Sequence, residues 1–158
     1  MKTFKPVLAA VALAAGALAT SSAYAWGHSR VAIGFNFSLG GVSYPNVILS
    51  TNGAIKLAAD GTTTFPTSWT NNLSNTYNAA IVAPLWDDNN ATDGTVSYLL
   101  SGTAPNRSFS VQWDNIHISG GGSDENPTGS FQLILFEGSN NIRFVYGTIN
   151  ALTGASIS

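Results

Sequence analysis

The chain has 158 residues and a formal net charge of −2, and only 9% of its residues are charged. It contains no cysteine, which excludes disulfide bonds, thiolate metal sites and thiol catalysis. Because acidic residues outnumber basic ones, nucleic-acid binding and electrostatic attachment to anionic membranes are disfavoured as well.

The N-terminal segment 1–25 has the pattern of a secretory signal peptide. Lys2 and Lys5 precede an Ala/Leu/Val run, and an Ala-Tyr-Ala sequence at 23–25 forms a small-x-small cleavage site. The apolar run is shorter than the roughly 20 residues of a transmembrane helix, the rival interpretation, so no membrane span is expected after cleavage. The predicted mature chain, 26–158, is long enough for one domain; its four basic and eight acidic residues give a net charge of −4.

The mature chain is predicted to be all-β. No later segment shows a sustained helical period, whereas Gly, Asn, Thr and β-branched residues recur. Apolar residues alternate over 31–37, which predicts a strand with one buried face. Asn52-Gly53 lies between two apolar runs and predicts a tight hairpin, because both residues tolerate positive φ angles. The polar stretch 60–78 is predicted to be a long loop held down by aromatic side chains.

Further strands are predicted after that loop, at about 79–86, 94–101, 107–118, 130–137 and 141–147. Within 107–118 the apolar side chains change from odd to even positions after Trp113, so a β-bulge is expected near Asp114-Asn115. The segment 130–137 is apolar at successive positions, which is typical of a central strand covered on both faces. Short strands at this spacing favour an antiparallel β-sandwich or jelly roll.

Several blocks of the sequence, taken in order, resemble the nidogen-like extracellular domain, usually called the NIDO domain, and related secreted bacterial β-sandwich modules. They lie within residues 31–148 and read IGFNF, VSYPNVILSTNGAI, AAIVAPLWDD, GTVSYLLSGTAPNRSFSVQWDNI and FQLILFEGSNNIRFVYG. The resemblance implies an extracellular, non-catalytic module associated with adhesion or matrix. It gives a mainly structural role to the positions that match the family's blocks, namely Pro84, Trp86, Asp87, Trp113, Asn115, Phe131, Gln132 and Tyr146.

The acidic stretch after Trp86 is the first candidate for chemistry. Asp/Asn-rich loops supply oxygen ligands to Ca²⁺, and the open candidates are Asp88, Asn90 and Asp93. The spacing does not fit an EF-hand loop, because the glycine comes one position late and Leu99 stands where the loop needs glutamate. Asx side chains that cap the turn between two strands, Asp87 among them, are the alternative. No other cofactor is expected.

No catalytic residue is predicted. The chain has no G-x-S-x-G elbow, and its carboxylates lack the spacing expected of jelly-roll glycanases. The two histidines are not at metal-ligand spacing. His28 is expected in a mobile N-terminus, and His117 is expected to face solvent.

Aromatic side chains are the remaining candidates for ligand binding. Trp86 and Trp113 lie in apolar strands and are expected in the core. Trp69 and Tyr77 belong to the predicted long loop, where they would stack on sugar rings or anchor the loop itself.

The sequence therefore predicts a secreted or cell-surface module that contacts an extracellular protein or glycan surface. Two alternatives remain, a carbohydrate-binding module and a filament or matrix subunit that forms homo-oligomers through an open sheet edge. The second alternative arises because similar domains continue past the Phe-x-Tyr-Gly strand with a further strand or two. Here we expect a short last strand, an open edge or a fragment of a longer protein.

Overall fold

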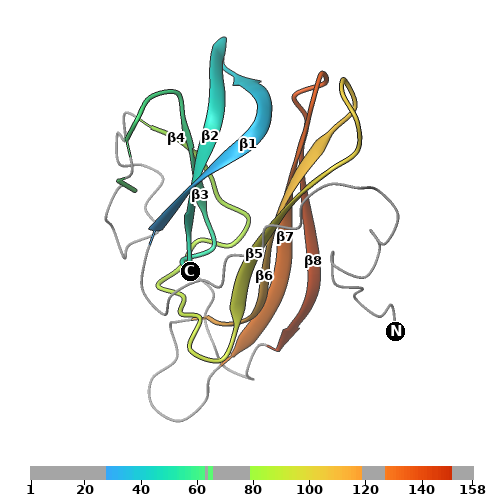
Figure 1. Cartoon of the computed structure of the whole chain (residues 1–158). Helices are drawn as coiled ribbons and strands as arrows, with labels where there is room; N and C mark the ends of the chain where they lie inside the picture. Colours follow the sequence, from blue (N-terminus) through green and yellow to red (C-terminus); the bar gives the residue numbers. More distant parts are fainter. Residues whose placement is uncertain (1–27, 63, 66–78, 119–126, 151–158) are drawn as a thin grey trace.

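The computed structural model describes residues 28–62, 64–65, 79–118 and 127–150, which form two antiparallel sheets packed face to face (Figure 1). The predicted all-β sandwich is confirmed. The described residues include no helix that is long and apolar enough to cross a membrane. The expected signal peptide lies outside them.

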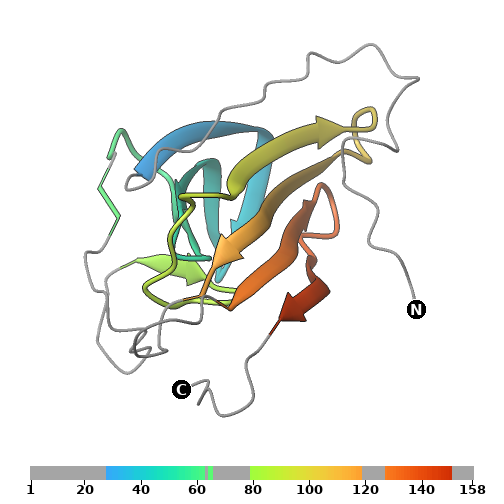
Figure 2. The same ribbon diagram turned by 90° about the horizontal axis from the view of Figure 1, so that it is seen from below.

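The strands follow chain order within each sheet. The first sheet contains β1 (His28–Leu39), β2 (Val42–Ser50), β3 (Ile55–Ala58) and β4 (Ala80–Val82). The second sheet contains β5 (Thr95–Ser101), β6 (Ser108–His117), β7 (Thr128–Phe136) and β8 (Ile142–Asn150). Each strand pairs antiparallel with the next one in its sheet, so two meanders face each other (Figure 2).

The main core lies between the two sheets, because alternate side chains of each strand point inward. The alternation is clearest in β1, where buried apolar residues take every second position over Val31–Phe37. Trp113 of β6 is fully buried, as expected for a tryptophan in an apolar strand, and its ring stacks on Phe131 of β7 with centroids 5.1 Å apart. Its indole N–H donates a 2.8 Å hydrogen bond to the Ser50 carbonyl oxygen, which joins the two sheets.

The hairpin predicted at Asn52-Gly53 is confirmed. β2 and β3 pair antiparallel with Leu49 opposite Ile55, so the turn between them is short. Gly53 has a φ of 73°, the left-handed conformation that glycine adopts without steric cost. The local sequence therefore determines this turn.

The bulge predicted near Asp114-Asn115 is also confirmed. The register between β6 and β7 shifts between Trp113 and Ile116, and Asn115 has a φ of 52°. Both Trp113 and Ile116 are fully buried, so the extra residue returns the apolar side chains to the core face.

The fourth strand is shorter than predicted: β4 covers only Ala80–Val82, instead of 79–86. Pro84 cannot donate to a strand ladder. The backbone amides of Leu85 and Asp87 donate to the hairpin tip instead. Leu85 N bonds to Gly53 O at 3.3 Å, and Asp87 N bonds to Asn52 O at 3.2 Å. Tertiary hydrogen bonds thus replace sheet pairing over the second half of the predicted strand.

The strand predicted to be central, β7, does lie between two neighbours in its sheet. Its outer face is covered only in part, since Ile134 and Phe136 are half-buried. The Arg143 guanidinium of β8 lies over the Phe136 ring at 4.9 Å from the centroid. The predicted coverage on both faces is therefore confirmed for the core face of β7 and only in part for its outer face.

A second apolar cluster covers the outer face of the first sheet. Phe65 and Trp86 pack edge to face there, with ring centroids 6.2 Å apart, over Ile48 of β2. His28 stacks on Phe65 with centroids 5.2 Å apart, and burial in this stack lowers the pKa of His28. The expected mobile position of His28 is therefore wrong, because β1 begins there and its first residue opposes Ser50.

Candidate functional site

The acidic stretch lies against the tip of the β2–β3 hairpin, and we call Pro84–Asn90 the clasp. Asn89 is fully buried, and its Nδ2 donates a 3.0 Å hydrogen bond to the Leu85 carbonyl oxygen. The clasp is so close to the turn that a Cβ on Gly53 would lie 2.8 Å from the Leu85 carbonyl carbon and would overlap its oxygen. The clasp backbone is therefore part of the packed structure.

The structure brings two of the three candidate calcium ligands, Asn90 and Asp93, to His117. Asn90 exchanges two backbone hydrogen bonds of 3.0 Å with His117, and Asp93 Oδ2 lies 3.0 Å from His117 Nε2. The Asn90 side chain caps a turn, since its Oδ1 accepts from Thr92 N at 3.2 Å. Asp88 Oδ1 is a buried atom without a hydrogen-bond partner. Within 28–62, 64–65, 79–118 and 127–150, no three His, Asp or Glu side chains are grouped to hold a metal ion.

His117 does not face solvent as predicted. Its side chain is 15% exposed, and its Nδ1 is buried without a hydrogen-bond partner. Ile116 and Ile118, on either side, are buried. The prediction failed because it considered only alternation along the strand, whereas Asn90 and Asp93 lie against His117. Asp93 itself is 72% exposed.

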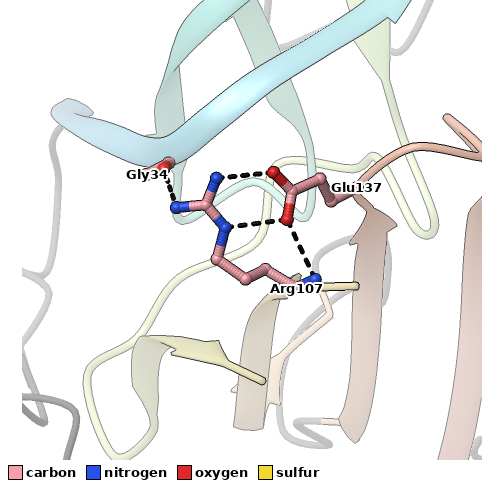
Figure 3. Close-up of polar contacts among 3 residues, drawn as sticks. All are labelled: Gly34, Arg107 and Glu137. Atoms are coloured by element: carbon pink, nitrogen blue, oxygen red, sulfur yellow. Dashed lines mark hydrogen bonds and ion pairs between the residues drawn. The ribbon is translucent and has the colours of Figure 1, made fainter. Parts of the chain in front are cut away.

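An ion pair that the sequence did not reveal lies at the ends of β6 and β7, and its arginine also reaches the opposite sheet (Figure 3). Arg107 Nε donates to Glu137 Oε2 at 2.7 Å, and Nη2 donates to Oε1. The Arg107 backbone N–H also donates to Oε2, at 3.0 Å. Arg107 Nη1 reaches across to the Gly34 carbonyl oxygen of β1 at 2.7 Å. These bonds connect the ends of β6 and β7 to the opposite sheet.

The register of the second sheet explains this pair. Ser108 opposes Phe136 in the β6–β7 ladder, and Glu137 N donates to Arg107 O at 2.8 Å, so the two charged residues are cross-strand neighbours. Hydrogen bonding from Arg107 lowers the pKa of Glu137, and the same contact raises the pKa of Arg107. The opposite charges at the adjoining ends of two predicted antiparallel strands were the signal that could have revealed the pair.

The ion pair lines an open groove of about 600 Å³. The groove lies where the β1–β2 register shifts between Ala32 and Phe37. Its other polar side chains are those of Asn36 and Asn46, and its walls include Phe35 and Pro45. The groove therefore combines neutral amides with a compensated pair of charges.

Replacing Glu137 with glutamine should reduce stability in a pH-dependent way. Because the pKa of Glu137 is lowered in the folded state, its contribution is fully present above the ordinary glutamate value of 4.5 and is lost as the pH falls through the lowered pKa. The urea midpoints of wild type and E137Q should therefore differ at neutral pH and converge in acid. R107Q is the control, since it removes the cause of the pKa shift. In the R107Q background, the urea midpoints with and without E137Q should no longer differ in a pH-dependent way. A pH dependence that is unchanged in this background would contradict this account.

Comparison with known families matches residues 2–158 to the family described as NIDO related. The chain belongs to the NIDO-related family. The resemblance found in the sequence blocks is thereby confirmed, and membership points to an extracellular domain. Comparisons with curated proteins and with solved structures gave no match.

Some block residues of this NIDO-related domain connect the clasp to its surroundings. Tyr146 of β8 donates a 2.6 Å hydrogen bond from its hydroxyl to the Pro84 carbonyl oxygen. Trp86 is buried, but in the outer cluster rather than between the sheets. Asp87 Oδ1 accepts from Asp88 N at 2.8 Å, which is a turn-holding contact. These residues attach the clasp to both sheets.

Other block residues of the NIDO-related domain lie in β6 and β7. Gln132 donates to Gln112 Oε1 at 3.1 Å, and both side chains are buried. Asn115, at the bulge, donates from its backbone N–H to the Ser130 hydroxyl oxygen at 3.0 Å and from Nδ2 to Asp93 O at 3.2 Å. The two loop aromatics, Trp69 and Tyr77, lie outside the described residues, so their proposed sugar contact stays a prediction.

Proposed function

We propose that this NIDO-related domain is secreted and acts outside the cell as a non-catalytic module that binds an extracellular protein or matrix surface. The family match over residues 2–158 carries the proposal. The signal-peptide pattern of segment 1–25 supports it, because that pattern directs a chain to export.

Several carboxylates already bond to other side chains of the domain, which supports a role without catalysis. A general acid or base must reach its substrate with a free polar atom. Protein partners occupy several carboxylates of the described residues: Asp93 contacts His117, Asp114 accepts from Ser130 at 2.8 Å, and Glu137 pairs with Arg107. These contacts give the three carboxylates a structural role, which favours a module without catalysis.

The groove beside the ion pair is the surface that we assign to recognition. Asn36 is exposed and Asn46 is half-buried, and each amide offers donors and an acceptor. The Arg107–Glu137 pair contributes polarity without net charge. An open groove of this kind suits an extended segment of an extracellular protein, whose backbone N–H and C=O groups match the amides.

Binding of the mature chain, 26–158, to an immobilised extracellular-matrix preparation tests this proposal. We expect saturable binding that the N36A/N46A double variant weakens by about tenfold, which corresponds to roughly 1.4 kcal/mol. The control is N106A, which removes an exposed asparagine amide outside the groove and should bind like wild type.

Three results would contradict the proposal. Failure of the wild type to bind any matrix component would remove the function itself. Equal binding by wild type and N36A/N46A would remove the groove as the contact surface. Binding that disappears when the matrix is enzymatically deglycosylated would replace a protein partner with a glycan.

A further inference from the structure

Within the part of the chain that the structure describes, strand β8 is an edge of the second sheet without the usual protection of sheet edges. Among the described residues it pairs only with β7, and it has nine residues without proline or lysine. Native edges are normally short, irregular or charged. On the first sheet, β4 has three residues and β1 carries an irregular register. The edge of β8 is neither short nor irregular over Ile142–Tyr146. Its register shift falls later in the strand, beside Gly129 and Phe131 of β7.

Two aromatic side chains of β8 lie on the core face but remain exposed. Phe144 opposes Leu133, and Tyr146 opposes Phe131, both of which are fully buried in β7. Cross-strand partners share one face of a sheet. Nevertheless, Phe144 is 42% exposed and Tyr146 is 49% exposed.

The short β4 explains this exposure. The hydrogen bond from Tyr146 to the Pro84 carbonyl places β8 on the same flank of the sandwich as the end of β4. With only three residues, β4 cannot cover a neighbouring edge strand of nine residues. The described part of the facing sheet therefore leaves both rings partly exposed. On the opposite edge strand β5, Leu100 lies against Gly34 of β1 and is 36% exposed, less than either ring of β8.

We propose that β8 pairs antiparallel with β8 of a second copy of the chain, over Ile142–Tyr146 and about a two-fold axis at Phe144. In this register Phe144 opposes its own copy, Ile142 opposes Tyr146, and Arg143 opposes Val145. An isologous interface requires such self-complementarity. Aromatic and aliphatic residues thus meet on the core face, and no like charges stand directly opposite each other.

Arg143 is the one charged residue of the strand, and its position is compatible with pairing. Its guanidinium lies over the Phe136 ring of β7, 4.9 Å from the centroid. That ring belongs to the neighbouring strand on the inner side, so the charge is drawn away from the free edge. A second strand can therefore approach without displacing a cation from the edge.

The exposed area determines how strong this pairing can be. Aromatic side chains bury roughly 150–250 Å² each, so the exposed parts of the two rings offer on the order of 200 Å² per copy. Stable interfaces bury about 800 Å² per partner. The pairing should accordingly be a reversible dimerisation that depends on concentration.

Sedimentation of the mature chain from low micromolar to submillimolar concentration tests the proposal. We expect the average mass to rise from that of a monomer towards that of a dimer in the wild type. In F144K it should stay at the monomer mass, because a lysine on an edge strand disfavours pairing with a second strand. V42K is the matched control, since Val42 is exposed to 46% on the other sheet, and it should dimerise like wild type. A wild type that remains monomeric throughout, or an F144K variant that dimerises equally, would overturn the proposal.

Disulfide trapping gives a second readout that does not depend on the folding of F144K. Because the chain contains no cysteine, each introduced thiol is the only one present. A mixture of R143C and V145C should form a covalent dimer under oxidation faster than either variant alone, since these two positions oppose each other. Equal rates in the mixture and in the separate solutions would contradict the antiparallel register.

Discussion

Replacing Gly53 with alanine is expected to lower the free energy of unfolding by about 3 kcal/mol. Two costs act together. An alanine at a φ of 73° must adopt the left-handed conformation, and its Cβ would overlap the Leu85 carbonyl oxygen. The obstacle is backbone, which cannot move aside as a flexible side chain does. Urea denaturation of wild type and G53A measures the difference.

The matched control for G53A is G41A. Gly41 has a similar φ of 80°, but no atom lies within 4 Å of a Cβ placed there. G41A should therefore show only the conformational cost, about 1 kcal/mol. If both variants lost the same stability, the close contact between the hairpin and the clasp would be refuted.

Replacing Trp113 with phenylalanine should have the second large effect. Trp113 is fully buried, and its indole N–H donates to Ser50 O, which belongs to a residue only 2% exposed. W113F would leave that carbonyl with an unmet hydrogen bond and leave a small void, for an expected loss of about 2–3 kcal/mol. W113A should cost about 4 kcal/mol, because it also removes most of the ring.

The control for W113F is F109L, four positions earlier in β6. Phe109 is also buried, at 1% exposure, but this substitution removes aromatic volume without removing a hydrogen bond. F109L should cost about 1 kcal/mol. Equal losses of stability in W113F and F109L would mean that the hydrogen bond from Trp113 to Ser50 does not stabilise the packing of the two sheets.

Local patterns in the sequence were enough to predict several parts of this fold. Asn52-Gly53 supplies the turn conformation by itself, and the change of alternation between Trp113 and Ile116 reveals the bulge. Both signals arise within a few residues, where backbone preference and burial act together. They remain valid without knowledge of the rest of the chain.

Other parts depend on contacts between distant segments. β4 ends early because Leu85 and Asp87 donate to a hairpin that lies more than thirty positions earlier. The Arg107–Glu137 pair needs the β6–β7 register, and the burial of His117 needs the segment Asn90–Asp93. Periodicity along one strand contains no information about these neighbours.

The clasp has an acidic sequence typical of a metal or catalytic site, yet its contacts are structural. Leu85 and Asp87 bond to the hairpin tip, Asn89 is buried beneath it, and Trp86 packs in the outer cluster. Tyr146 connects the same stretch to the second sheet. These contacts make the clasp a structural element that joins both sheets, and they leave recognition to the surface.

Hydrogen exchange at the Leu85 and Asp87 amides, measured in calcium-free buffer, tests that claim most directly. Both amides donate to hairpin carbonyls, so they should be protected to the same degree as the amides of the β2–β3 ladder. Exchange at the rate of an unstructured peptide, or protection that appears only when calcium is added, would contradict the structural role of the clasp.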